Sequence, residues 1–289
     1  MPKARQRYTV LFVILACILT GSTFALWPFI RVIQQEREKM TNLPEPPSGY
    51  QWVTVPELSD EFDGEYLDPD KWLNAHPYWG GRNPSQFDPQ NVWVKDGTLH
   101  LQSTTDIMAL SEVTNPAQDV WVRSACVSSK EPTAFYGYYE TRMKASQLSM
   151  TSSFWCQGKY SEIDVVEQLG APKDQPSRST SMLMNTHYYP DGWESDKKTP
   201  VTSRMDTGAA DSFHIYGVWW KDESTIWFYH NGEKVADITT GGAFLEPMFM
   251  FFDTEVFVWE GLPDIDALKD PGKNRMTVDW VRSWELVEK

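Results

Sequence analysis

Cysteine, histidine and positive charge are scarce in this sequence, and each scarcity excludes a class of protein. The 289 residues contain three cysteines and five histidines, and 26 Lys and Arg stand against 40 Asp and Glu, for a net charge of −14. Three cysteines do not make a disulfide scaffold. The histidines and cysteines show no zinc-ligand spacing. An acidic chain without a basic stripe is not expected to bind nucleic acid.

The cysteines are too few to decide the redox state of the protein. Cys17 lies in the N-terminal apolar run. Cys126 and Cys156 could pair if the fold brought their strands together, but we expect buried free thiols.

Long amphipathic helices are also lacking after residue 40, whereas aromatic residues are abundant. The chain has 14 Trp, 12 Tyr and 14 Phe, which make 14% of the sequence. We expect most of these rings in the core. Flat rings with a polar edge also stack on sugars, so composition leaves a carbohydrate-binding surface open as well.

The N-terminus predicts export. Basic residues within 1–7 precede an apolar run from Tyr8 to Ile30. Residues 1–30 are predicted to be a signal peptide cleaved after Ala25, or an uncleaved anchor long enough to span a bilayer. Lipidation at Cys17 is a third alternative. All three place the protein in a secreted or periplasmic location, or on the outer face of the membrane, with an N-terminal anchor as its one membrane contact.

The rest of the chain reads as a linker and one domain. Residues 31–49 form a charged and then Pro-rich linker, and residues 50–289 show no second break in composition and no internal repeat. We expect this domain to act as a monomer.

Many short strands follow one another in this domain. Alternating segments flank Asp96-Gly97 and Asn231-Gly232, dipeptides that two-residue hairpin turns demand. Four further segments with strand patterns are residues 134–146, 213–221, 247–257 and 277–287. Many short strands with turn signals predict an all-β, two-sheet antiparallel sandwich.

One of these segments, "SEIDVVEQLG", carries three carboxylates. Alternation places Glu162 and Asp164 on one face of a strand and Glu167 on the other. A β-bulge between Asp164 and Glu167 would return Glu167 to the same face and align all three acids. The alternative is a solvated face on an edge strand. Phe154 and Trp155 precede the acids and favour a cleft.

Two such glutamates suit glycoside hydrolysis. In a retaining enzyme, one carboxylate attacks the anomeric carbon, and the other protonates the leaving oxygen and later activates water, with the two carboxyls about 5 to 5.5 Å apart. An acid between them, as Asp164 would be, raises the pKa of a neighbour or shares a proton with it.

The motif Glu162-Ile-Asp164-Val-Val-Glu167 resembles the E-x-D-x-x-E signature of glycoside hydrolase family 16. Similarity extends over nearly all of residues 50–289 and includes "LSDEFDGEYLDPDKW", "SKEPTAFYGYYETRMKAS", "FHIYGVWWKDESTIWFYHNGEKV" and "TVDWVRSWEL". The resemblance implies a concanavalin-A-like jelly roll with a concave substrate cleft. It also implies Glu162 as nucleophile, Glu167 as acid/base, Asp164 as helper, and no cofactor for catalysis.

The segment "PYWGGRNPSQFDPQNVWVKDGTLHL" is similar to the agarase and porphyranase branch of the family. By this resemblance, Trp79 would stack on a galactose ring, and Arg82 would reach hydroxyls or a sulfate ester. The alternatives are a loop packing residue and a surface charge.

Three more residues are candidates for contact with the sugar chain. Trp155 would form the floor of the cleft, unless it is a core residue. His187 follows the acid strand as a subsite histidine does in agarase-like enzymes, although a structural histidine is equally compatible with the sequence. Trp193, in "DGWES", is a candidate subsite aromatic residue.

Many family members hold a structural calcium ion on the convex side. Asp279 and the backbone carbonyl near Gly97 match the positions of its oxygen ligands. The alternative is that Asp279 faces solvent.

Three functions remain open. The first is a secreted retaining endo-β-glycosidase that cuts β-1,4 linkages of red-algal galactans, agarose or porphyran, by double displacement. The second is a β-1,3- or β-1,3-1,4-glucanase. Glucan-cutting relatives commonly have Met in the second half of the motif, where this chain has Val166, which weighs mildly against them. The third is a non-catalytic carbohydrate-binding protein on the same fold, but all three carboxylates are retained. A transglycosylase is compatible with the same covalent chemistry.

Overall fold

The computed structural model describes residues 41–289. The predicted signal peptide or anchor, residues 1–30, lies outside the described residues. The compact domain begins at Pro44, six residues before its predicted start. The backbone carbonyl of Pro44 contacts the domain, where it accepts a hydrogen bond from the Trp52 indole at 2.7 Å. Within residues 41–289, no helix has the length and apolar character needed to cross a membrane.

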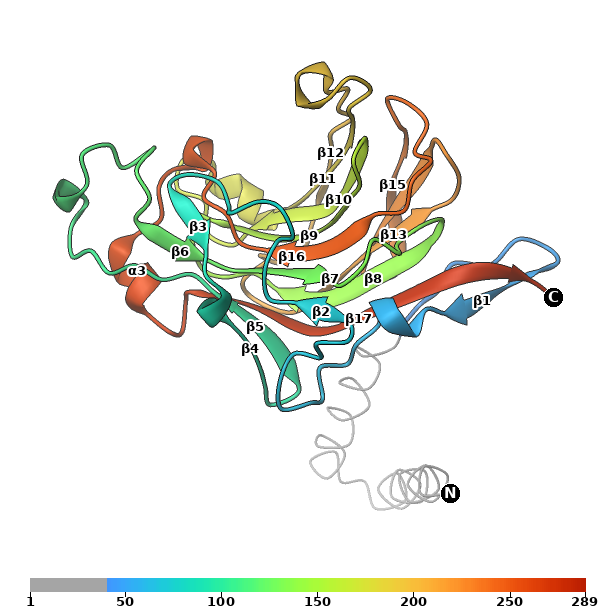
Figure 1. Cartoon of the computed structure of the whole chain (residues 1–289), viewed down its shortest axis with the longest axis horizontal. Helices are drawn as coiled ribbons and strands as arrows, with labels where there is room; N and C mark the ends of the chain where they lie inside the picture. The colour runs from blue at the N-terminus through green and yellow to red at the C-terminus, as the bar shows by residue number, and fades with distance from the viewer. Residues whose placement is uncertain (1–40) are drawn as a thin grey trace, which may run out of the picture. The chain divides into compact units, whose positions relative to one another are not determined.

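Two antiparallel sheets lie one over the other, which confirms the predicted sandwich (Figure 1). The first sheet consists, in spatial order, of β15 (Glu233–Thr239), β14 (Thr225–His230), β13 (His214–Trp220), β8 (Gly137–Lys144), β17 (Arg275–Glu288), β5 (Thr98–Gln102) and β4 (Val92–Lys95), with β1 (Tyr50–Thr54) paired along β17. The second consists of β12 (Val201–Arg204), β11 (Ser181–Tyr188), β10 (Ser161–Leu169), β9 (Thr151–Gln157), β16 (Phe249–Asp253), β7 (Cys126–Ser129) and β2 (Trp72–Leu73).

The remaining elements are short. A two-stranded parallel pair joins β3 (Ser85–Phe87) to β6 (Val122–Ser124), and the α-helix of the described residues is α3 (Ile265–Lys269). The 3-10 turns are Pro56–Leu58, Pro89–Asn91, Leu110–Glu112, Pro176–Thr180, Trp193–Ser195 and Val258–Glu260.

Both predicted hairpins form at the predicted residues. Asp96 and Gly97, with φ of 54° and 74°, join β4 to β5. Asn231 and Gly232, with φ of 50° and 84°, join β14 to β15. Positive φ at both turn residues is the conformation in which the turn twist matches the strand twist. These two turns therefore set the order and register of four strands in the first sheet.

Strand alternation separates the core from the exposed face of the second sheet. Along β9, Phe154 and Cys156 point into the core between the sheets, and Ser153 and Trp155 point to the opposite face. Cys126 and Cys156 are both buried and unpaired, as expected. The second sheet curves over the face that carries Ser153 and Trp155, and this face holds the candidate active site.

Candidate active site

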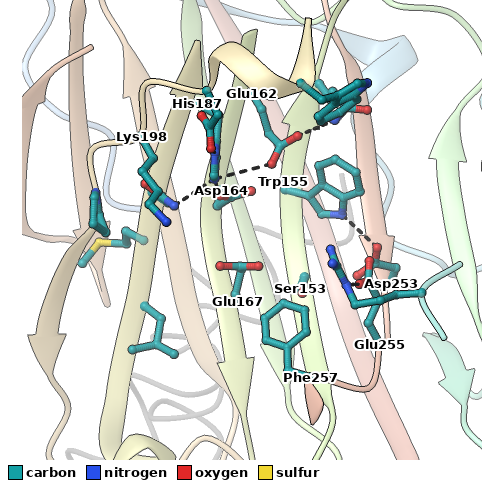
Figure 2. A pocket seen from close by; sticks show the side chains of 18 of the residues that line it. Ser153, Trp155, Glu162, Asp164, Glu167, His187, Lys198, Asp253, Glu255 and Phe257 are labelled. Atoms are coloured by element: carbon teal, nitrogen blue, oxygen red, sulfur yellow. Dashed lines mark hydrogen bonds and ion pairs between the residues drawn. The ribbon is translucent and has the colours of Figure 1, made fainter. Parts of the chain in front are cut away.

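The three predicted carboxylates lie in a row on β10, as the predicted bulge requires. Asp164 pairs with Trp155 of β9 and Val166 pairs with Phe154, so Val165 is an extra residue in the ladder. Beyond the bulge, Glu167 returns to the face of Glu162 and Asp164 (Figure 2). The strand lies between β9 and β11, so the alternative of a solvated edge strand is wrong.

The row forms part of the floor of a cleft of about 920 Å³. Aromatic, acidic and basic side chains from both halves of the sheet and from the surrounding loops line it. All five sequence-predicted sugar contacts are among the lining residues, which are Trp79, Arg82, Trp155, His187 and Trp193.

Glu162 is held by two hydrogen-bond donors. Its Oε2 accepts hydrogen bonds from the side-chain amide of Gln157 and, at 3.2 Å, from the hydroxyl of Tyr189. Gln157 is held in turn by the Tyr78 hydroxyl, which donates to its Oε1 at 2.8 Å. Burial, and then the charge of Asp164, raise the pKa of Glu162 from 4.5 to about 8, and the imidazole of His187 is the largest influence that lowers it.

Asp164 lies between the two glutamates and faces His187. Burial and the charge of Glu167 raise the pKa of Asp164 well above its ordinary value. Its Oδ2 is buried and accepts no hydrogen bond from a described residue, while Nε2 of His187 lies 3.3 Å away. Nε2 of His187 is also 3.8 Å from Oε1 of Glu162. This proximity follows from the register of β10 and β11, which pairs Glu162 with His187 and Asp164 with Asn185.

Glu167 lies beside a second acidic pair on β16 and the loop that follows it. Asp253 and Glu167 both pair with Ser153 of β9, one from each side, so a small residue separates them. Glu255 follows two residues later and lines the same cleft. Burial, then the charges of Glu162 and Glu255, raise the pKa of Glu167 to about 7. A carboxyl that holds its proton near neutral pH suits a general acid.

Arg82 neutralises part of this acidic cluster. Its Nε donates to Oε2 of Glu255 at 2.5 Å, and Glu255 is nearly buried whereas Arg82 is half exposed. The guanidinium carbon lies 5.7 Å from the Trp79 ring centroid, 5.3 Å from that of Phe257 and 5.9 Å from that of Trp259. Arg82 is therefore an ordered cleft residue surrounded by rings, and the alternative of a free surface charge is wrong.

Trp155 is both a buried residue and part of the cleft lining. It is 7% exposed, its indole Nε1 donates to Oδ2 of Asp253 at 3.2 Å, and its ring stacks on Phe251 with centroids 4.4 Å apart. The imidazole of His76 is stacked with both rings, with its centroid 4.5 Å from that of Phe251 and 5.9 Å from that of Trp155. Trp155 therefore meets both alternatives from the sequence, because it packs as a buried residue and also lines the floor of the cleft.

Trp193 lies at the rim of the cleft. It is 63% exposed, and its ring centroid is 4.4 Å from that of Tyr189, the residue that donates to Glu162. An exposed indole attached to a fixed ring offers a platform for a sugar.

The predicted calcium ligands do not fit a calcium site. Asp279 is nearly buried, and its Oδ2 pairs with Nη1 of Arg142 at 2.6 Å. Calcium takes six to eight oxygen ligands, and a carboxylate already bound to a guanidinium is a poor member of such a set. Gly97 occupies the β4–β5 turn as expected.

Among residues 41–289, one group of side chains has metal-compatible spacing. Glu162, Asp164 and His187 offer ligand atoms within 4.8 Å of one another. Two of these three side chains, Glu162 and His187, also have hydrogen-bond partners in the protein.

Several cleft residues were not predicted from the sequence. Gln157 could have been found, because it lies two residues after Trp155 and alternation puts both on one face. Glu255 and Asp196 lie in loops, where no periodic pattern indicates which side chain enters the cleft.

A curved antiparallel sandwich with a long aromatic cleft and a row of carboxyls across its floor defines a glycoside hydrolase that acts on an extended sugar chain. Residues 52–286 match the family model described as beta-porphyranase A-D, GH16 domain. The chain belongs to glycoside hydrolase family 16.

Relatives and solved structures agree with this assignment. The chain is 35% identical over 287 residues to beta-porphyranase B of Phocaeicola plebeius, covering 86% of this chain and 89% of the relative. It is 36% identical over 260 residues to beta-porphyranase E of Zobellia galactanivorans, covering 83% and 90%. The crystal structure of the beta-porphyranase BpGH16B from the human gut bacterium Bacteroides plebeius superposes with a TM-score of 0.75 at 34% identity, covering 89% of this chain and 99% of that one.

Proposed function

We propose that this glycoside hydrolase is a retaining endo-enzyme that cuts β-1,4 linkages of red-algal galactans, porphyran or agarose, by double displacement. The observation that carries the proposal is the bulged row Glu162, Asp164 and Glu167 on the floor of an open cleft. The names of the two similar relatives, both beta-porphyranases, support the galactan as substrate class.

In the first step, an oxygen of Glu162 attacks the anomeric carbon while Glu167 transfers its proton to the glycosidic oxygen. The sugar–oxygen bond breaks, and a glycosyl ester forms on Glu162. In the second step, the Glu167 carboxylate takes a proton from water, and the water oxygen displaces Glu162 from the anomeric carbon. Both carboxyls return to their starting states, and the configuration is retained.

The two glutamates have different surroundings. Glu162 accepts hydrogen bonds from Gln157 and Tyr189, which favour its anion and offset part of the rise in pKa that burial and the charge of Asp164 cause. Glu167 has its pKa raised to about 7 by burial and neighbouring acids, so it can supply a proton near neutral pH.

The cleft offers subsites on both sides of the row. Arg82, with the rings of Trp79 and Trp259, lies on the side of Glu255 and Glu167. Trp193 lies on the side of Tyr189 and Glu162. Rings on both sides suit a long chain that is cut internally.

The test is product formation on agarose, porphyran, κ-carrageenan, laminarin and lichenan, with Glu162→Gln as the control. We expect oligosaccharides from porphyran or agarose with retained anomeric configuration by NMR, and none from the control. Products from laminarin or lichenan alone would overturn the substrate class, and activity of the control would overturn the role of Glu162.

We also propose that the enzyme works outside the cytoplasm as a monomer. The basic and apolar N-terminal sequence and the acidic net charge of −14 support this location. Cell fractionation and the mass of the purified catalytic domain by light scattering test the two statements separately.

A further inference from the structure

A second arginine lines the cleft beyond Glu167, and the proposed reaction does not use it. Arg178 belongs to the 3-10 turn Pro176–Thr180, which lies between β10 and β11. Its side chain is 37% exposed and lines the same cleft as the row of acids. One of its five N–H groups donates from Nη1 to Oε1 of Glu260, and no other described residue accepts a hydrogen bond from Arg178. The remaining donors are therefore free to bind a ligand in the cleft.

Glu260 fixes the position of this guanidinium. Its side chain is fully buried, and its backbone carbonyl accepts hydrogen bonds from the backbone N–H groups of Lys173 and Asp174, both at 3.0 Å. Oε2 of Glu260 is buried and accepts no hydrogen bond from a described residue. A buried carboxylate that is left half unpaired costs stability, and a single ion pair offsets this cost only in part. Stability alone therefore does not explain the pair, which instead holds Arg178 in one place.

The segment that carries Glu260 also supplies rings for a sugar. Phe257 and Trp259 are stacked with their centroids 4.5 Å apart, and Trp259 is 51% exposed. Figure 2 shows Phe257 at the end of the row that carries Glu167. Trp259 directly precedes the residue that anchors Arg178, so this end of the cleft combines an exposed indole with a fixed guanidinium. The first suits a sugar ring, and the second suits an anionic substituent.

Arg178 is better placed than Arg82 to receive such an anion. Three acids act electrostatically on Arg82, namely Glu167, Asp253 and Glu255. An anionic substituent beside Arg82 would be repelled by all three. Arg178 has one ion-pair partner among the described residues, Glu260, and the other acid that acts on Glu260 is the exposed Asp174, whose charge is screened by solvent and salt.

We propose that Arg178 and Trp259 form a subsite for a sulfated sugar unit of the substrate. The free N–H groups of Arg178 bind the sulfate ester, and the Trp259 ring stacks on the sugar. The ligand is thus a sulfated galactan chain, porphyran rather than agarose, and no bond forms or breaks at this subsite. The inference rests on the proposed function, because it names a substituent that the galactan of that reaction carries.

The test is binding by the full chain with Glu162→Gln, the parent variant, which we expect to bind without cutting. The ligands are porphyran and the same porphyran after chemical desulfation, and Kd is measured for each by isothermal titration calorimetry. The parent should bind the sulfated chain more tightly. Addition of Arg178→Gln should reduce this preference about 10-fold, the lower end of what a hydrogen bond to a charged group contributes. The preference of the parent should also shrink as the salt concentration rises.

Four further variants separate binding from folding. Arg178→Gln with Glu260→Gln replaces the ion pair by a neutral hydrogen bond, so it should lose the same preference with a Tm closer to that of the parent. Arg178→Lys should recover part of the preference, because it keeps the charge without the planar fork. Arg123→Gln, which removes an ion-paired arginine outside the cleft, should bind as the parent does. Trp259→Ala should weaken the binding of both chains by a similar factor, because stacking does not depend on sulfate.

The possible failures are distinguishable. An equal loss on the two chains in Arg178→Gln, or no loss on the sulfated chain, would overturn the sulfate subsite and leave the proposed function intact. Binding of laminarin or lichenan by the parent, with no binding of either galactan, would overturn the proposed function and the sulfate subsite together.

Discussion

Replacing the proposed nucleophile should stabilise the protein. The folded chain raises the pKa of Glu162 from 4.5 to about 8, mainly by burial. Between these two values the folded protein holds a proton that the unfolded chain releases, so stability falls as pH rises through this window and levels off above it. Glu162→Gln removes this dependence, because glutamine is neutral in both states, and its side-chain oxygen can still accept from Gln157.

The size of the effect follows from the pKa change. At pH 7 the wild type gives up about 3 kcal/mol relative to a neutral isostere, and at pH 5 about 1 kcal/mol. For a domain of this size, each kcal/mol moves Tm by about 2–4 °C. Glu162→Gln should therefore melt about 6–12 °C above the wild type at pH 7, and about 2–4 °C above it at pH 5.

The assay is thermal unfolding by circular dichroism at half-unit steps from pH 5 to pH 8, together with urea unfolding at 25 °C. Glu65→Gln, an exposed acid in a loop of the same domain, is the matched control and should follow the wild type. A difference in Tm that stays constant with pH, or that shrinks as pH rises, would contradict the buried-acid reasoning.

Three further outcomes are expected. The pH profile of kcat/KM should be bell-shaped with its optimum between about pH 7 and 8. The pKa values of Glu162 and Glu167 are raised to about 8 and about 7, and the two carboxyls titrate as a coupled pair, so an optimum near pH 5 would count against this reasoning. Trp193→Ala should raise KM about 2- to 10-fold with kcat nearly unchanged, since it loses one exposed stacking surface, and a fall in kcat alone would exclude that role. EDTA should leave Tm unchanged, because Asp279 is neutralised by Arg142; a Tm reduced by EDTA and restored by calcium would reinstate the calcium prediction.

The features that the sequence predicted well are those with a local physical cause. Asp96-Gly97 and Asn231-Gly232 adopt positive φ at low energetic cost, so these four residues were enough to predict both hairpins. The bulge at Val165 was inferable because three acids had to share one face, and a single extra residue is the simplest way to align them.

The features that it did not predict depend on contacts between distant segments. Asp279 has the character of a metal ligand in isolation, and only the pairing of β17 with β8 brings Arg142 to it. Glu255 and Asp196 enter the cleft from loops, where side-chain direction has no period. Family resemblance supplied the roles of the acids and indicated His187 as a cleft residue, but the contact of His187 with Asp164 and Glu162 follows from the register of β10 with β11.

The bulge also determines which changes in chain length the catalytic strand can accept. Val165 is the surplus residue, and Val166 and Glu167 already pair with β9 as a regular strand would. A chain without Val165 would therefore present all three acids by plain alternation, at the cost of one buried valine side chain. Removal of Ile163 instead would leave the spacing from Asp164 to Glu167 intact but turn Glu162 toward the core. Deletions at different positions of this strand therefore have different effects on the active site. Homologues that differ by one residue between the second and third acid can share the same active-site geometry.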